Sequence, residues 1–159
     1  MRIFKKDSGV ATVTYAQALD QALCFGWIDG QKLAGDAQSW LQKFTPRRPA
    51  SGWSKRNTEH AQRLIGSGDM TAAGLAEIEA AQADGRWKAA YSAFGSAEAP
   101  ADFLAELRRN KKAYAFFQTL NKTNRYSIVY RLETAKKEQT REKRKQAIIA
   151  MLARGEKFH

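Results

Sequence analysis

The sequence predicts an α+β fold, in which a small N-terminal β-α-β-β sheet layer precedes a mostly helical C-terminal bundle. Before Pro49, short segments of alternating apolar and polar residues are separated by turn-forming residues. After Pro49, apolar residues recur at helical spacing instead. A chain of 159 residues, 43% of them hydrophobic, can build one substantial core. We therefore expect a single domain over residues 1–159, with a sheet-containing part at 1–49 and a helical part at 50–159.

The N-terminal residues indicate one strand and one helix. Residues 2–6 form a short apolar and basic run typical of an edge strand, and the turn-forming residues 7–9 end it. Thr14 and Gln17 have the spacing of a capping box, which predicts a helix that begins there and ends at Gly26.

Two further segments are expected to pair as a hairpin. Residues 26–30 indicate a strand that follows the glycine, and residues 39–44 alternate, with Lys43 on the face opposite the aromatic residues. Residues 34–36 are an Ala-Gly-Asp turn between them. Together with the first strand, these segments complete the predicted sheet layer.

Apolar stripes at helical spacing continue through the rest of the chain. Ser54 or Asn57 can cap the first of these helices, and Asn110 a later one. The stripes lie at residues 60–65, 75–82, 87–94, 103–107, 113–120, 126–132 and 147–152. A charged turn ahead of the last stripe indicates either a helix break near Glu138 or a helix that leaves the core.

The net charge of +11 is concentrated in the last third of the chain. Residues 1–104 contain 12 Lys/Arg and 11 Asp/Glu, whereas residues 105–159 contain 15 Lys/Arg and 5 Asp/Glu. Such a basic segment favours attraction to polyanions, including nucleic acid and anionic membrane surfaces. The alternative is a solvated basic face that keeps the protein soluble.

The sequence favours a cytoplasmic protein. It contains no apolar run long enough for a signal peptide or for the roughly 20 residues of a membrane span. Its single cysteine, Cys24, excludes an internal disulfide framework and fits a reducing compartment. We expect no integral membrane segment, and nothing in the sequence indicates the oligomeric state.

The residue types needed for common metal and catalytic sites are scarce. With two histidines and one cysteine, no His/Cys metal set can form, and no Walker, dinucleotide-binding or HExxH motif occurs. A triad of Cys24, His60 and Asp29 is conceivable, but Cys24 lies at the apolar end of a helix, where packed cysteines are common. The sequence therefore predicts no metal and no cofactor, and it favours a non-enzymatic role.

The stretch FTPRRPASGWSKRN, residues 44–57, is the first candidate for a binding site. Arg47 and Arg48 lie close in sequence to a helix start at Ser54 or Asn57. The backbone N–H groups and the dipole at a helix start favour a phosphate or carboxylate, and Arg supplies planar bidentate donors.

The same stretch also has a structural interpretation. For an anion site, Trp53 provides a stacking face for a base or sugar. For a rigid connector, the two prolines stiffen the chain, Trp53 fills the core and one arginine pairs with Asp29. Both interpretations stay open.

The basic C-terminal segment is the second candidate. Its cations can neutralise phosphates without reading the base sequence, although no aromatic residue is interleaved to stack bases. These cations are Lys136, Lys137, Arg141, Lys143, Arg144 and Lys145. Alternatively, Lys136, Thr140 and Arg141 turn toward the Asp29 or Trp53 region and complete one composite pocket.

Four passages together resemble a known family. In chain order they are ALCFGWIDG (22–30), FTPRRPASGWSKRN (44–57), DGRWKAAY (84–91) and ETAKKEQTREKR (133–144). They are similar to the bacterial bacteriocin-protection proteins of the YdeI or OmpD-associated class, over essentially the whole chain. Members usually carry extra residues ahead of the first strand, so this chain resembles a short version. Members also often have a proline in the block corresponding to residues 137–138, and this sequence has none there.

The resemblance implies a role in bacteriocin tolerance or envelope stress and no established reaction. We therefore expect a non-enzymatic protein of this type with a basic anion-binding surface. One alternative is an enzyme or binder that uses Asp29, Arg47, Trp53 and Lys136 around a phosphorylated or carboxylated small molecule, and another is a nonspecific nucleic-acid binding protein. The candidate ligand-binding residues are Asp29, Arg47, Arg48, Trp53, Ser54, Asn57, Lys136, Thr140, Arg141 and Arg144.

Overall fold

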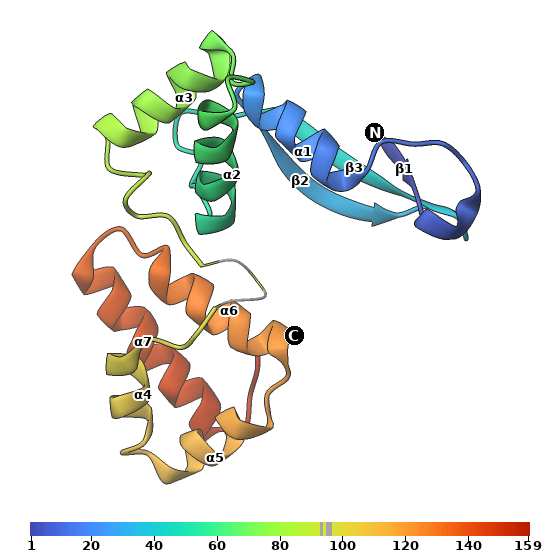
Figure 1. The fold of residues 1–159 in the computed structure, drawn as a ribbon. Coiled ribbons are helices and arrows are strands. Elements are labelled where there is room, and N and C mark those ends of the chain that lie inside the picture. Colours follow the sequence, from blue (N-terminus) through green and yellow to red (C-terminus); the bar gives the residue numbers. More distant parts are fainter. Residues whose placement is uncertain (93, 95–96) are drawn as a thin grey trace. The chain divides into compact units, whose positions relative to one another are not determined.

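The computed structural model describes residues 1–92, 94 and 97–159. The chain divides into two compact units, Met1–Ala90 and Tyr91–His159 (Figure 1). The division falls well beyond Pro49, where we expected the sheet-containing part to end, because the next two helices pack into the core of the first unit. One domain over residues 1–159 stays a prediction.

The first unit contains a three-stranded antiparallel sheet. Its strands are β1 (Arg2–Phe4), β2 (Trp27–Ala34) and β3 (Ser39–Pro46), in the order β1-β3-β2. The predicted edge strand and hairpin are therefore present, and the mixed α and β composition is confirmed. The exact β-α-β-β order is not matched, because a short 3-10 helix, η1 (Lys6–Ser8), stands where we expected only a turn.

A bulge interrupts the pairing of β2 with β3. Asp29 pairs with Phe44 and Lys32 with Gln42, so β2 has one more residue than β3 between these two pairs. Such an extra residue bends the strand and changes the direction of nearby side chains. Both hollows described below beside the β2–β3 pair include Gly30, which lies in this bulge.

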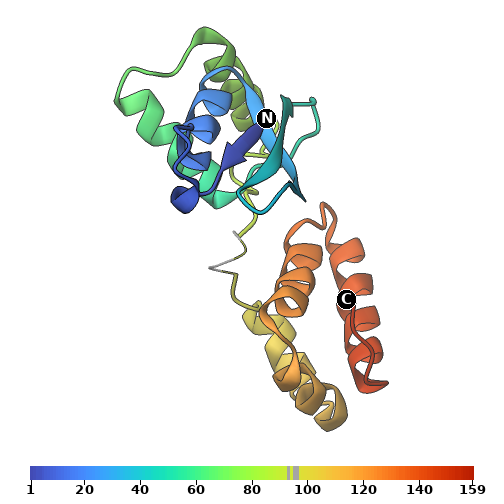
Figure 2. The same ribbon diagram turned by 90° about the vertical axis from the view of Figure 1, so that its right-hand side faces the viewer.

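Helix α1 (Tyr15–Cys24) contacts β2 and begins as predicted (Figures 1 and 2). The Thr14 side chain accepts a hydrogen bond from the Gln17 backbone, and the Gln17 side chain accepts one from the Thr14 backbone. Gly26 follows the helix with φ of 73°, a left-handed conformation that glycine adopts readily.

Helices α2 (Lys55–Gly66) and α3 (Ala72–Ala83) complete the first unit. Together with α1 they bury a core that consists of Leu19, Leu23, Cys24, Trp53, Ala61, Leu64, Ile78 and Ala81. The predicted helix at 87–94 is wrong over its described residues, which form turns and irregular chain. Trp87 instead packs on Trp53, so a tertiary contact outweighs the helical spacing; residue 93 lies outside the described residues.

The second unit is helical. It contains α4 (Ala101–Leu107), α5 (Lys111–Thr119), α6 (Lys122–Glu133) and α7 (Glu138–Ala153). Their apolar faces bury a separate core of Phe103, Leu107, Ala113, Phe117, Leu120, Ile128, Leu132, Ile148, Ile149 and Leu152. The chain leaves the helical conformation between Glu133 and Glu138, which confirms the predicted helix break. No helix in the described part of the chain has the length and apolar character to cross a membrane.

Candidate anion-binding site

Hydrogen bonds of backbone N–H groups fix the connector between β3 and α2, residues 47–54. The Arg47 N–H donates to the Gly26 carbonyl, 3.0 Å away. Arg48 and Ser51 close a tight turn, because Arg48 N–H donates to Ser51 Oγ and Ser51 N–H donates to the Arg48 carbonyl. Ser54 then caps α2 by accepting a hydrogen bond from the Asn57 N–H. The helix start is thus capped by one of the two predicted residues.

Arg47 and Trp53 pack against each other inside the first unit. Arg47 is 6% exposed and Trp53 is 2% exposed. The guanidinium carbon of Arg47 lies 3.4 Å from the centroid of the Trp53 ring, and Arg47 Nη1 donates to the Gly52 carbonyl. Trp53 in turn packs on Trp87. The burial of Trp53 agrees with the connector interpretation, and Trp53 offers no exposed stacking face.

Asp29 is held by neutral partners. Its Oδ2 accepts a hydrogen bond of 2.7 Å from the Tyr15 hydroxyl, and its Oδ1 accepts one of 3.4 Å from Asn57 Nδ2. Burial raises the pKa of Tyr15, and the hydrogen bond to Asp29 raises it further. The connector interpretation had paired Asp29 with an arginine; the structure gives it Tyr15 and Asn57 instead.

A polar hollow of about 340 Å³ lies on the outer face of the hairpin beside the connector. Ile28 pairs with Thr45 across the strands, so both side chains share this face, and Lys43 lies two residues further along β3 on the same face. The Arg48 turn adjoins it. The polar hollow is lined by Ile28, Gly30, Gln31, Lys43, Thr45, Pro46, Arg48 and Ser51.

The charge of the polar hollow suits an anion. Two of its lining residues, Lys43 and Arg48, are cationic and exposed, and none is acidic. Within the described residues, neither cation forms an ion pair. Thr45 and Ser51 add hydroxyl donors. A guanidinium, an ammonium and two hydroxyls can together bind a phosphate or carboxylate group.

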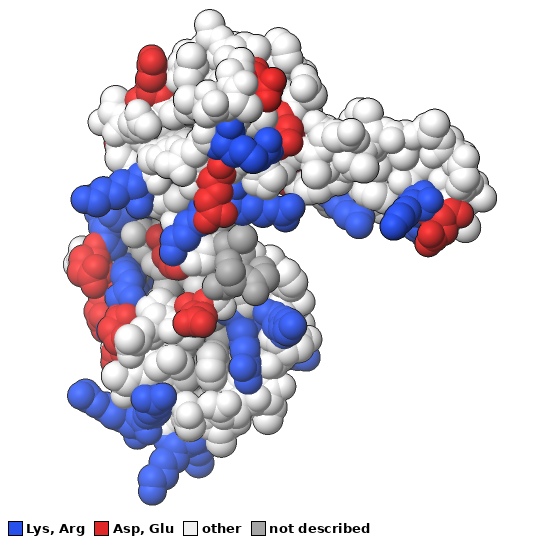
Figure 3. Space-filling model, viewed as in Figure 1, with Lys and Arg blue, Asp and Glu red and all other residues white. Residues whose placement is uncertain are grey.

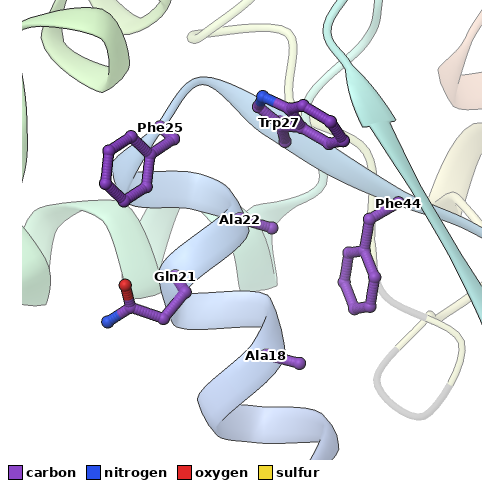
Figure 4. A pocket seen from close by; sticks show the side chains of 6 residues that line it. All are labelled: Ala18, Gln21, Ala22, Phe25, Trp27 and Phe44. Atoms are coloured by element: carbon purple, nitrogen blue, oxygen red, sulfur yellow. The ribbon is translucent and has the colours of Figure 1, made fainter. Parts of the chain in front are cut away.

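Two other hollows in the first unit have different chemistry. The apolar hollow, about 410 Å³, lies between α1 and the strands, where Phe44 from β3 faces Ala18 and Ala22 (Figure 4). It also includes Phe25 and Trp27, which are 55% and 40% exposed. Another hollow, of about 370 Å³, contains Asp29, Tyr15, Lys32, Trp40 and Gln42.

The conceivable catalytic triad is not assembled. His60 Nδ1 lies 3.0 Å from Asp20 Oδ1, and Asp20 also binds Arg63. Burial raises the pKa of the Cys24 thiol, which keeps it protonated and weakly nucleophilic. Asp29 is engaged elsewhere, so these three groups do not form a nucleophile, a base and its orienting acid.

The predicted residues of the C-terminal segment lie in the second unit. Arg141 binds Asp102 in a bidentate pair, with both nitrogen–oxygen distances below 3 Å. Arg144 Nη1 donates to the Arg131 carbonyl. Lys136 precedes α7 and Thr140 lies in its first turn, and both are exposed. Because Asp29 and Trp53 belong to the other unit, the composite pocket stays a prediction.

Most of the residues that line the polar hollow were not predicted from the sequence. Of its lining residues only Arg48 was among the candidates, whereas Lys43, Thr45 and Ser51 were not. One usable signal was present, because the alternation of residues 39–44 placed Lys43 on the face opposite the aromatic side chains. Nothing in the sequence indicated that the Arg48 turn would lie beside that face.

Two different family models match the two parts of the chain. Residues 96–155 match the family model described as bacteriocin-protection, YdeI or OmpD-associated. The helical unit is therefore the part of the chain that is similar to this family. Residues 1–77 match a different model, a domain of unknown function (DUF8412). No curated protein and no solved structure matches the chain significantly.

The match to the YdeI or OmpD-associated model extends across the whole of α4, α5, α6 and α7. Of the four passages that suggested the family, the one at 133–144 falls within this match. The passages at 22–30 and 44–57 fall within the other model, and the passage at 84–91 lies between the two. The family resemblance is thus confirmed for the helical unit, and its extent over the whole chain is not.

Proposed function

We propose that this protein is a non-enzymatic, cytoplasmic accessory protein of bacteriocin protection that binds a small anion in the polar hollow of its first unit. The bacteriocin-protection role is supported by the family match over residues 96–155. The observation that carries the binding role is the pair of exposed cations, Lys43 and Arg48, which line one hollow without an acidic neighbour.

The hollow favours a phosphorylated or carboxylated small molecule. Its volume, about 340 Å³, is that of a site for a small ligand. Arg48 can form two parallel hydrogen bonds to a planar carboxylate or to two phosphate oxygens, while Lys43 adds a point charge. Because Arg48 belongs to the turn closed by Ser51, its backbone is fixed before the ligand binds.

A calorimetric titration with inorganic pyrophosphate tests the binding role. We expect saturable binding by the native chain, and a loss of about tenfold in affinity for Lys43→Gln or Arg48→Gln, the size expected when one charged hydrogen bond is removed. Lys88→Gln is the matched control, because Lys88 is an exposed cation of the same unit that does not line the hollow. Equal affinities for the native chain and both hollow variants would refute this site.

The protective role needs a separate assay. A bacteriocin-sensitive bacterium that expresses the chain should survive a higher dose of bacteriocin than the same strain carrying an empty vector. If Lys43→Gln with Arg48→Gln abolishes pyrophosphate binding but leaves the survival curve unchanged, anion binding and protection are independent. Unchanged survival with the native chain itself would remove the protective role.

A further inference from the structure

The turn between α4 and α5 forms a basic corner outside the proposed anion site. Arg108 and Arg109 follow the end of α4, and Lys111 and Lys112 begin α5, with only Asn110 between the two pairs. All four side chains are exposed. Figure 3 shows Lys and Arg side chains at the end of the helical unit where α4 turns into α5, without acidic side chains beside them.

The acidic residues nearest in sequence are already paired with α7. Asp102 binds Arg141, and Glu106 binds Lys145 at 2.8 Å. Lys145 also binds Glu142. Two cations of α7, Arg141 and Lys145, are therefore neutralised by carboxylates of α4 and of α7 itself. Among the described residues, none of the four cations of the basic corner forms an ion pair or a side-chain hydrogen bond.

The position of Lys111 and Lys112 does not serve helix stability. Lys111 and Lys112 are the first two residues of α5, at the positive end of its dipole, where cations are unfavourable. Asn110 already caps this helix, since its side chain accepts a hydrogen bond from the Ala113 N–H. Lys111 and Lys112 oppose this dipole, and the four cations of the corner repel one another. An anion that neutralises them would relieve both effects.

We propose that the basic corner is a docking surface for the phosphate backbone of double-stranded nucleic acid. Binding to a membrane surface commonly adds exposed apolar side chains that enter the lipid interface. In the described part of the second unit, the exposed large apolar residues are Phe94 and Tyr130, and neither lies in α4 or α5. The corner also contains no aromatic side chain on which single-stranded bases could stack. The corner can therefore recognise a nucleic acid only by its phosphate charge. A duplex presents that charge at a higher density than a single strand does.

This inference is independent of the small-anion site in the first unit. It also differs from the expectation that α7 supplies the nucleic-acid contacts, because two of those cations, Arg141 and Lys145, are engaged by carboxylates. The surface recognises backbone charge, so we expect binding without sequence preference and with strong dependence on salt.

The test is a fluorescence-anisotropy titration of a labelled duplex of about 20 base pairs with the full chain at several salt concentrations. The variant replaces all four corner cations with Gln: Arg108→Gln, Arg109→Gln, Lys111→Gln and Lys112→Gln. We expect an affinity loss of about tenfold or more at low salt. The slope of log affinity against log salt should fall by about 3 to 4, since each phosphate contact contributes roughly 0.9.

The control removes the same charge from exposed lysines outside the basic corner and outside the predicted C-terminal segment: Lys6→Gln, Lys88→Gln, Lys122→Gln and Lys157→Gln. Its affinity should fall by less than about threefold, since only long-range attraction is lost. An equal loss in both variants, or no salt-sensitive duplex binding by the native chain, would overturn the proposal. Tighter binding to phosphatidylglycerol vesicles than to duplex would also overturn it, and would identify a membrane surface as the partner.

Discussion

The guanidinium group of Arg47 lies on the face of Trp53, with its carbon 3.4 Å from the ring centroid. Arg48, the next residue, is exposed and lines the polar hollow. Two adjacent arginines thus have opposite surroundings. Arg47 is buried against the Trp53 ring, whereas Arg48 is exposed and can contact a ligand.

Trp53→Ala should strongly destabilise the first unit. Removing a fully buried tryptophan leaves a cavity, takes the packing partner from Trp87 and exposes the buried face of Arg47, at a cost of about 3–5 kcal/mol in free energy of unfolding. Trp27→Ala is the control, because Trp27 is 40% exposed and should cost much less. Urea denaturation followed by tryptophan fluorescence reports on this unit alone, since all four tryptophans precede residue 91. Similar losses for the two variants would contradict a structural role for Trp53.

Gly74→Ala should destabilise the protein, although Ala is the better helix former. A Cβ atom at Gly74 in α3 would collide with the Met70 sulfur and with the carbonyl oxygens of Cys24 and Leu23. Two of these neighbours are backbone atoms at the end of α1, so relief of the clash requires α1 and α3 to separate. We expect the free energy of unfolding to fall by about 1–3 kcal/mol, as in other overpacked cores.

Gly66→Ala supplies the contrast. A Cβ atom at Gly66, the last residue of α2, has no neighbour within 4 Å. The substitution should therefore be neutral or should stabilise the protein by up to about 1 kcal/mol. A stabilised Gly74→Ala variant would show that α1 and α3 pack less closely than described.

The pair between Arg141 and Asp102 predicts the acid response of the helical unit. Hydrogen bonds from Arg141 lower the pKa of Asp102 to about 2. A lowered pKa in the folded state adds stability above the unfolded pKa of roughly 4, and this stability is lost as the pH falls from about 4 through 2. Because the Asp102 side chain is 47% exposed, solvent screening limits the gain to about 1 kcal/mol or less.

Asp102→Asn should remove that part of the acid response. Denaturation followed by far-UV circular dichroism at pH 6 and pH 3 should show a smaller difference in stability for the variant than for the native chain. Glu98→Gln is the matched control, because Glu98 is an exposed acid outside the ion pairs of the described residues. If Asp102→Asn and Glu98→Gln behave alike, the pair contributes nothing measurable.

Lys111→Glu with Lys112→Glu should stabilise the helical unit. Acidic residues in the first turn of α5 interact favourably with the helix dipole, and each is worth about 0.3–1 kcal/mol at low salt. Asn110→Ala should act in the opposite direction and cost about 1 kcal/mol, because the cap of the same helix is lost. Far-UV circular dichroism during urea denaturation measures both. A destabilised double variant would indicate that these lysines stabilise the folded chain through packing contacts and are not free to bind an anion.

Local features of the fold could be predicted from the sequence, because each depends on a few neighbouring residues. Thr14 and Asn110 cap their helices as expected, and the break before Glu138 follows from charges at positions that a continuous helix would bury. The turn at Trp87 could not be predicted, since its conformation depends on a contact with Trp53 more than 30 residues away.

The candidate site depended on tertiary structure to a greater degree. Sequence alone could not decide which of Arg47 and Arg48 is buried, because that depends on where Trp53 enters the core. Lys43 joined the site only because the hairpin places it beside the Arg48 turn. Likewise, the sequence did not indicate that Arg141 is paired, because its partner Asp102 lies in α4, 39 residues away in the chain.

The most direct test of the proposed binding role is a pyrophosphate titration of the isotope-labelled chain followed by amide chemical shifts. We expect saturable shifts concentrated at residues 28–31 and 43–51, which surround the polar hollow. These shifts should be lost in the Lys43→Gln, Arg48→Gln double variant. Shifts that instead concentrate elsewhere in the chain, or that persist unchanged in that variant, would contradict the proposed binding role.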